Sequence, residues 1–408
     1  MRIKKILNSL ETEDTKRRET LGFMKMKRIC IISTTPEFLG GVSLYSWDVA
    51  KMAIESGRYK VFWIYGGKKN KKYKKDSITF VELKTSKIYP LSEIDFNNKV
   101  GKFLEQNDFD IINSHAIWGS WMNDYNKKKN QKIIHTYHGS TFHFFKNHLK
   151  GPGFKRKISS AFMAIFGLII EGPPWKKADG IVCVSEHLER EFSSLYGKRK
   201  GVHVLRTGVD LKKFRKQPKL SCLKKLGLDK NKIYGLYVGR GGFWTKGLDK
   251  VISLSKEIYR QDNNFRLLVL GADKNKVSHL IKEDFVKILP PIEREDMPDY
   301  YNSSDIFFSM SRCEGGAPTM VTSEAMASGC LIVTDKEANQ EVIEDGKNGM
   351  IIGKNYNKAA RKILDILKNK RKLDQIRRGS LKRVKKLGLE LWEKRYLKIF
   401  NYERDNSF

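Results

Sequence analysis

The sequence alternates short apolar runs with glycine-containing turns and amphipathic stretches, and this alternation narrows the possible folds more than any other feature. The apolar run of residues 27–34 (KRICIIST) is followed by the turn Gly40-Gly41, a helical pattern over 42–56 and a second apolar run over 59–65 (YKVFWIY). Strand, turn, helix and strand in this order are typical of a βαβ unit, whose strands are parallel. The first part of the chain therefore predicts a parallel sheet covered by helices.

The same alternation runs along most of the chain in two successive series. Two such series predict an α/β protein with two Rossmann-like, doubly wound domains that face a central cleft. The further strand-like runs are 110–115, 132–139, 180–186 and 203–210 in the first series, and 234–240, 266–272, 286–291, 305–311 and 331–335 in the second. The expected divisions are a polar N-terminal extension, an N-terminal domain, a lysine-rich linker, a C-terminal domain and a final helix that crosses back to the N-terminal domain: 1–23, 24–211, 212–232, 233–385 and 386–408.

One glycine-rich stretch, 239–247 (GRGGFWTKG), falls at the C-terminal end of a predicted strand, where ligands of doubly wound sheets bind. It supplies Arg240 and Lys246 beside the start of a predicted helix. Two cations and the backbone N–H groups of a helix N-terminus suit a diphosphate. The alternative is that both are ordinary surface cations in a chain with 79 Lys and Arg residues.

A second glycine-rich stretch, 313–329 (CEGGAPTMVTSEAMASG), also follows a strand-like run. It places Glu314 and Glu324 on either side of a loop with few side chains. Carboxylates accept hydrogen bonds from paired hydroxyls, and glycine lets backbone N–H groups approach a ligand closely. We expect the two glutamates to hold sugar and ribose hydroxyls. The alternative is a solvated Glu314 and a helix capped by Ser323.

Taken in order from about residue 27 to 400, these stretches resemble the retaining glycosyltransferases of family 4 (glycosyl transferases group 1), which have the GT-B fold of two Rossmann-like domains. The resemblance rests on many short matches in sequence order, which makes it more specific than any single motif. The matching stretches are Gly40-Gly41, His138-Gly139, 178–186 (ADGIVCVSE), 207–214 (TGVDLKKF), Arg240 with Lys246, 293–315 (EREDMPDYYNSSDIFFSMSRCEG), 324–335 (EAMASGCLIVTD) and 338–352 (ANQEVIEDGKNGMII).

The resemblance implies roles for the predicted donor-binding residues. Arg240 and Lys246 would bind the diphosphate of a nucleotide sugar held by the C-terminal domain, and Glu324 would accept the ribose hydroxyls. The turn at Gly40-Gly41, in the N-terminal acceptor domain, would meet the same diphosphate from the opposite side of the cleft.

It also implies which residues lie next to the reacting sugar. Glu314 would lie beside the transferred sugar with the backbone amides of Gly315 and Gly316. His138 would lie near the reacting carbon, where it positions or stabilises the donor; the residues alone also allow a packed histidine at a strand end. Relatives usually place seven residues between the two glutamates and this chain places nine, so either the loop bulges or the role of Glu314 passes to the backbone.

The activity that the resemblance implies is retaining transfer of a hexose-type sugar from a nucleotide diphosphate sugar to a glycan or lipid-linked acceptor, in the synthesis of cell-envelope polysaccharide or a glycoconjugate. No cofactor and no metal ion is expected, because Arg240 and Lys246 would neutralise the leaving diphosphate. Asp108-Phe109-Asp110 has the spacing of a DxD metal motif, but it leads directly into a strand-like run and is expected to serve strand entry. The alternatives are an epimerase or phosphorylase of the same fold, and a basic protein that binds nucleic acid without catalysis.

The formal net charge of +33 favours an anionic partner; the alternative is that part of it reflects a lysine-rich genome and carries no function. The stretch 145–170 (FKNHLKGPGFKRKISSAFMAIFGLII) joins lysines and arginine to an apolar segment, which predicts either contact with an anionic membrane surface or a core helix. No recognised nucleic-acid module is visible, so no specific nucleic acid is expected as a partner.

The apolar segments and the cysteines indicate where in the cell the protein is located. The longest apolar run, 162–170, is shorter than the roughly 20 residues that cross a bilayer, and no apolar segment follows the basic N-terminus as in a signal peptide. The five cysteines are scattered without metal-ligand spacing, which favours a reducing compartment. We expect a cytoplasmic protein that lies peripherally on the inner face of the cell membrane.

Overall fold

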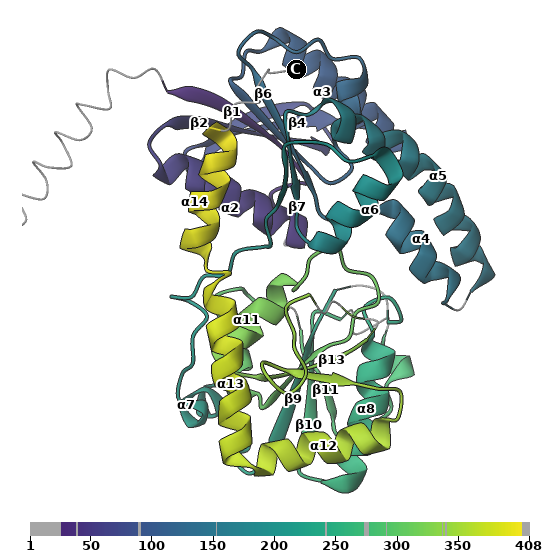
Figure 1. The fold of residues 1–408 in the computed structure, drawn as a ribbon, viewed down its shortest axis with the longest axis vertical. Coiled ribbons are helices and arrows are strands. Elements are labelled where there is room, and N and C mark those ends of the chain that lie inside the picture. Colours follow the sequence, from purple (N-terminus) through teal and green to yellow (C-terminus); the bar gives the residue numbers. More distant parts are fainter. Residues whose placement is uncertain are drawn as a thin grey trace, which may run out of the picture. The chain divides into compact units, whose positions relative to one another are not determined.

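The computed structural model describes residues 26–37, 40–88, 91–151, 153–240, 243–272, 277–290, 292–336, 338 and 341–401. The predicted N-terminal extension 1–23 lies outside these residues. Within them the chain forms two β-sheets, each flanked by helices, which confirms the predicted α/β fold class (Figure 1).

The first sheet has eight strands. Their order is β3 (Lys71–Lys75), β4 (Ile78–Lys84), β2 (Tyr59–Gly67), β1 (Lys27–Ile32), β5 (Ile111–His115), β6 (Lys132–Tyr137), β7 (Gly180–Cys183) and β8 (Val202–Val204). β1 pairs in parallel with β2 and β5, and its Ile and Cys side chains are fully buried, as in strands covered on both faces. β3 pairs antiparallel with β4, and its lysines discourage further pairing at this edge.

Helices connect these strands as the βαβ pattern predicts. The helical pattern after Gly40-Gly41 forms α2, which stops before Gly57, a residue with φ of +68° that would strain any side chain. The helices are α2 (Gly41–Glu55), α3 (Leu91–Gln106), α4 (Thr141–Leu149), α5 (Phe154–Lys177) and α6 (Glu186–Tyr196), with the short 3-10 helix η1 (Ser120–Asn123).

The second sheet has six strands, and every pair is parallel. Their order is β11 (Val286–Ile288), β10 (Phe265–Leu270), β9 (Ile233–Val238), β12 (Ile306–Ser309), β13 (Leu331–Asp335) and β14 (Met350–Ile352). Counted along this sheet, the order is 3-2-1-4-5-6, the classical dinucleotide-binding arrangement. The direction of winding reverses between β9 and β12, so the loops after these two strands meet at the switch point where such sheets bind their ligands.

Both faces of the second sheet are covered by helices. One apolar cluster joins the strands to α8 (Leu248–Gln261) and α12 (Tyr356–Lys368), and another joins them to α7 (Lys219–Lys225), α10 (Met297–Ser303) and α11 (Met320–Ser328). α13 (Lys370–Lys385) contributes residues to both clusters. The chain continues into α14 (Leu389–Asn401), where the Tyr396 hydroxyl shares a 2.9 Å hydrogen bond with that of Thr136 in β6. A short 3-10 helix, η2 (Ser278–Leu280), precedes β11.

The chain divides into two compact units. One consists of Met1–His135 with Lys177–Asp179, and the other of Thr136–Lys176 with Gly180–Phe408. The predicted boundaries of the two domains, 24–211 and 233–385, stay a prediction.

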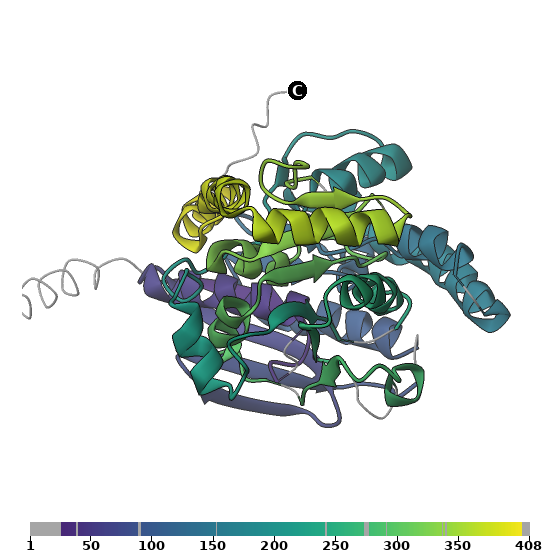
Figure 2. The same ribbon diagram turned by 90° about the horizontal axis from the view of Figure 1, so that it is seen from below.

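α4 and α5 lie side by side in both views (Figures 1 and 2). Their contact is close, since a Cβ atom on Gly167 would come within bonding distance of the Thr141 hydroxyl. α5 buries Ala164, Ile170 and Trp175 on one face. The opposite face is apolar and exposed, and it carries Phe154, Ile158, Phe162, Ile165 and Ile169.

By length and composition, residues 157–177 of α5 could cross a membrane, and half of this window is buried. The prediction that no segment is long enough is therefore wrong. It counted only the uninterrupted apolar run 162–170, whereas the helix also takes in the small residues before it and Pro173 and Pro174 near its end. A partly buried core helix passes the same test, so no membrane crossing follows from it.

Candidate donor-binding site

The loop after β9 carries the two predicted phosphate-binding cations. Arg240 is exposed just beyond the strand, and Lys246 directly precedes Gly247, which caps α8. Gly247 has φ of +72°, and a Cβ atom there would lie 2.0 Å from the carbonyl oxygen of Met310. Only glycine permits this approach, so the loop after β9 is held against the end of β12.

The loop after β12 brings a predicted carboxylate to one of these cations. Oε1 of Glu314 lies 2.6 Å from Nζ of Lys246, and neither side chain is more than a third exposed. The alternative of a solvated Glu314 is therefore wrong. Two residues predicted to serve the phosphate and the sugar meet at the switch point of the second sheet.

The same loop rests on the backbone that follows β6. A Cβ atom on Gly315 would lie 2.0 Å from the carbonyl oxygen of His138, whereas on Gly316 it would meet no atom closer than 3.5 Å. Gly315 thus permits a backbone-to-backbone contact that places Glu314 near His138. Loss of hydration lowers the pKa of His138 to about 3, so its imidazole is neutral at physiological pH.

Arg312 fixes the two loops to each other, and sequence reasoning missed it. Its guanidinium donates to both carboxylate oxygens of Asp249, at 2.7 and 2.8 Å, and its plane lies over the Trp244 ring. A bidentate pair of this kind holds both partners in one orientation. The only sequence signal is an arginine just before the predicted glutamate, which is weak in a chain so rich in arginine and lysine.

Glu324 lies on α11 and is 2% exposed. The Tyr301 hydroxyl donates to its Oε2 at 2.8 Å, and Arg294 lies 2.9 Å from its Oε1. Burial raises the pKa of this carboxyl, and the charge of Arg294 opposes the rise. Oε1 receives no well-directed hydrogen bond from the residues that the structure describes, because the Arg294 contact has ion-pair distance without hydrogen-bond direction.

Ser323 does not cap α11, contrary to the alternative considered for this stretch. The side chain of Thr319 accepts the hydrogen bond of Thr322 N–H, and Ser323 lies inside the helix. The capping alternative therefore does not account for the two glutamates.

Arg206 and Glu341 anchor the far side of the loop, and neither was predicted. Arg206 donates to the carbonyl oxygen of Ala317 at 2.9 Å and to Glu341 at 3.0 Å. The Glu341 carboxylate also accepts the backbone N–H groups of Glu186 and His187 at the start of α6, where an anion is favoured.

In the other compact unit, Gly40-Gly41 opens α2. Gly40 is in an extended conformation at the N-cap, and a Cβ atom on Gly41 would meet none of the described residues within 4 Å. Packing therefore does not require glycine at position 41. The open space before this helix start is compatible with the predicted approach of an anion.

A pocket of about 150 Å³ in this unit was not predicted from the sequence. It lies at the C-terminal ends of β1, β2 and β4, and Trp118 Nε1 donates to Glu93 there at 2.6 Å. Burial raises the pKa of Glu93. The lining is rich in hydroxyls and consists of Ser33, Thr34, Thr35, Gly66, Thr85, Ser92, Glu93, Phe96 and Trp118.

The DxD-like stretch has structural partners. Asp110 accepts the backbone N–H of Arg28 at 2.6 Å beside the first strand, and Asp108 pairs with Lys128 at 2.7 Å. The prediction of a strand-entry role is confirmed.

Two family models match the chain. Residues 39–213 match Glycosyltransferase Family 4, and residues 221–383 match Glycosyl transferases group 1. The first match takes in β2 to β8 and the second takes in β9 to β14.

Similar proteins are found by sequence and by structure. Spore coat protein SA of Bacillus subtilis (strain 168) is 25% identical over 378 residues, which cover 86% of this chain and 92% of that protein. Alpha-monoglucosyldiacylglycerol synthase of Acholeplasma laidlawii is 27% identical over 164 residues, which cover 37% of this chain and 40% of that protein.

Two solved structures show the same fold. Sucrose-phosphate synthase from Thermosynechococcus elongatus matches with a TM-score of 0.75 at 16% identity, covering 92% of this chain and 98% of that one. Anabaena HepE in complex with UDP-glucose matches with a TM-score of 0.68 at 15% identity, covering 92% and 99%. With a family model matched in each half and this likeness over nine-tenths of its length, the chain belongs to the group 1 glycosyltransferases and has the GT-B fold.

Proposed function

We propose that the protein transfers a hexose-type sugar, with retention at the anomeric carbon, from a UDP-sugar to a glycan or lipid-linked acceptor in cell-envelope or glycoconjugate synthesis. The observation that carries the proposal is the contact between Lys246 and Glu314, 2.6 Å apart at the switch point. It puts a cation for the diphosphate beside a carboxylate for the sugar hydroxyls. The UDP-glucose complex of Anabaena HepE supports a uridine nucleotide.

In the proposed reaction, the leaving diphosphate is stabilised by side chains and backbone. Arg240, Lys246 and the N–H groups at the start of α8 neutralise its charge without a metal ion or another cofactor. Glu324 accepts a ribose hydroxyl through Oε1, the atom that lacks a directed hydrogen bond among the described residues. The predicted role of Gly40-Gly41 toward the diphosphate stays part of this proposal.

The neutral imidazole of His138 and the amides of Gly315 and Gly316 hold the transferred sugar. A neutral histidine can donate one hydrogen bond and accept another, which suits sugar hydroxyls. The charge state of His138 also matters. A positively charged imidazole beside the anomeric carbon would destabilise the positive charge that develops there during transfer.

We assign the acceptor sugar to the pocket lined by Ser33, Thr85, Glu93 and Trp118. Hydroxyls, a carboxylate and an indole face are the groups that bind sugar hydroxyls and sugar C–H surfaces. For a lipid-linked acceptor, the exposed apolar face of α5 rests on the inner face of the cell membrane, with Lys146 of α4 and Lys150 at its C-cap toward anionic lipid. The name of the Acholeplasma relative, a diacylglycerol glycolipid synthase, supports such an acceptor.

The experiment measures thermal stability with UDP, GDP and ADP, for wild type and Lys246→Ala. A nucleotide at 100 times its Kd adds about 2.7 kcal/mol to the free energy of unfolding. We expect a rise with UDP that Lys246→Ala loses and that the exposed surface variant Lys230→Ala keeps. No rise with any nucleotide, together with a salt-sensitive rise with DNA or RNA, would replace this proposal with nucleic-acid binding. Turnover to a nucleotide-sugar isomer without an acceptor would replace it with an epimerase.

A further inference from the structure

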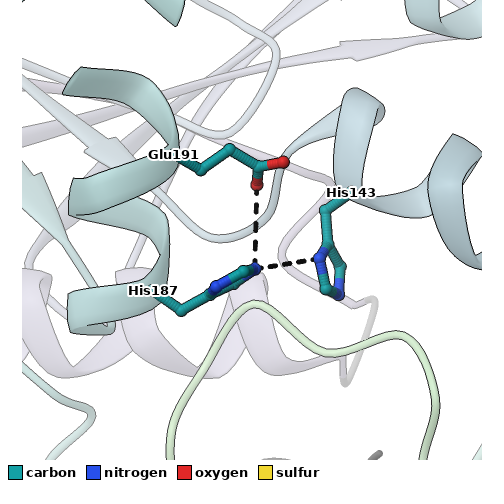
Figure 3. A group of neighbouring side chains, drawn as sticks. All are labelled: His143, His187 and Glu191. Carbon is teal, nitrogen blue, oxygen red and sulfur yellow. Dashed lines mark hydrogen bonds and ion pairs between the residues drawn. The ribbon is translucent and has the colours of Figure 1, made fainter. Parts of the chain in front are cut away.

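α4 and α6 bring together a side-chain cluster that the proposed transfer does not use. His143 comes from the first turn of α4, and His187 and Glu191 come from one face of α6, four residues apart (Figure 3). Both helices begin at a serine whose side chain accepts a backbone N–H, Ser140 for α4 and Ser185 for α6. The caps fix the starts of the two helices and so the directions of the three side chains.

The three side chains present ligand atoms at metal-binding distances from one another. Nε2 of His187 lies 2.9 Å from Nδ1 of His143 and 3.9 Å from Oε2 of Glu191, and all three atoms lie within 4.8 Å of one another. Ligands about 2.0–2.1 Å from a tetrahedral zinc ion are about 3.3 Å apart. Small side-chain rotations would therefore bring the three atoms into one coordination sphere.

Glu191 gives independent evidence that this cluster binds a cation. Its side chain is 8% exposed, and Oε2, which points into the cluster, accepts no hydrogen bond from any residue that the structure describes. Ser140, which caps α4, lies close to the Glu191 carboxylate. A buried carboxylate oxygen without a donor is costly, and a cation bound there would remove the cost.

We propose that His143, His187 and Glu191 bind one zinc ion, or a similar divalent transition metal, with the fourth position open to water. Two imidazoles and one carboxylate are a ligand set that zinc prefers, and a helical spacing of four residues is a common source of two of them. The His187 side chain is 47% exposed, which leaves an approach for the ion and for a water ligand. The bound ion fastens α4 to α6.

Binding of the metal ion fixes the ring proton of His143 on Nε2 and turns the side-chain amide of Asn147. Nδ1 of His143 offers its lone pair to the metal, so Nε2 carries the ring proton. Nε2 lies 3.0 Å from the side-chain amide of Asn147, which turns its oxygen toward this proton. Lys146 and Lys150 lie close enough to His143 to disfavour a cation there, and Lys146 also acts on the Glu191 carboxylate.

The test is zinc titration of the full-length, tag-free protein after chelator treatment, followed by calorimetry and by the metal content after gel filtration. We expect one zinc ion per chain, and Zn²⁺ binding at least 10-fold weaker in His143→Ala and in Glu191→Gln. Co²⁺ should give the visible spectrum of a tetrahedral nitrogen and oxygen site. The matched control is His148→Ala on the same helix, whose ring instead contacts Ser160; it should bind zinc as wild type does.

Two results would overturn the proposal. One is that chelator-treated wild type retains no zinc and shows no binding heat. The other is that the ligand variants, checked for an unchanged circular dichroism spectrum, bind zinc as wild type does. None of these readouts depends on glycosyl transfer, so the site can fail while the proposed function stands.

Discussion

Nζ of Lys246 lies 2.6 Å from Oε1 of Glu314, although the two residues are 68 positions apart in the chain. The pair is largely shielded from solvent, so the contact is a charge-assisted hydrogen bond worth about 1.5–3 kcal/mol. A diphosphate that binds Lys246 has to compete with Glu314 for it. In the proposed reaction the carboxylate is then released to the sugar, which would couple binding of the nucleotide to positioning of the transferred group.

This competition predicts opposite effects of one substitution on binding and on turnover. In Glu314→Gln the ammonium of Lys246 is no longer paired with a charge, so UDP should bind about 3- to 10-fold more tightly, a gain of up to about 1.4 kcal/mol. The turnover number with a UDP-sugar should fall about 10-fold or more, because the sugar loses a charged acceptor. Calorimetry with UDP and initial rates measure the two effects, and Lys230→Ala serves as the unchanged control. Weaker UDP binding in Glu314→Gln would show that Glu314 does not compete with the diphosphate.

Two adjacent glycines offer a matched test of the loop that carries Glu314. Gly315→Ala places a methyl group 2.0 Å from the His138 carbonyl oxygen, so the loop has to move, whereas the methyl group of Gly316→Ala meets nothing closer than 3.5 Å. We expect kcat/KM to fall about 100-fold in Gly315→Ala, since displacements near 1 Å cost this much, and to change less than about 3-fold in Gly316→Ala. Equal losses in the two variants would mean that the contact with His138 does not position the loop.

The fold could be predicted from the sequence because the buried strands are short apolar runs separated by helical patterns, and several of them, such as β9 and β10, lead directly into glycine. The contacts between side chains that build the candidate sites could not be predicted from the sequence. Lys246 and Glu314 were both singled out, but their contact depends on the switch point that places the loops after β9 and β12 side by side. Arg312 and Arg294 were missed because single arginines carry little signal in a chain with 79 basic residues.

The cluster of His143, His187 and Glu191 shows the same limit. Only the four-residue spacing on α6 is visible in the sequence, and the third ligand comes from a helix 44 positions away. The hydroxyls of the pocket beside Trp118 come from three separate segments, and none of them stands out alone.

The exposed face of α5 predicts membrane binding that can be removed without unfolding the protein. Ile165 and Ile169 are 65% and 63% exposed, so Ile165→Asp with Ile169→Asp should leave thermal stability nearly unchanged. Binding to vesicles with a fifth of anionic lipid should weaken at least about 10-fold, because each isoleucine contributes roughly 1.5–3 kcal/mol when buried. Co-sedimentation with vesicles measures this. The control is Leu220→Asp, a leucine equally exposed on α7. Unchanged sedimentation of the double variant would show that the exposed face of α5 does not carry membrane binding.

Glu171 predicts how stability depends on pH. This carboxyl accepts hydrogen bonds from the backbone N–H and the hydroxyl of Thr141, both at 3.0 Å, and so joins α5 to the start of α4. Burial raises its pKa from 4.5 to about 7. Between these values the native state binds more protons than the unfolded state, so the contribution of Glu171 is fully present below pH 4.5 and is lost as pH rises through 7. Relative to Glu171→Gln, the wild type should lose on the order of 3 kcal/mol between pH 4.5 and 7.5. Urea unfolding of both proteins at these two pH values measures the difference, and the exposed Glu105→Gln provides the control. A constant difference between wild type and Glu171→Gln would mean that the pKa of Glu171 is the same in the native and the unfolded protein.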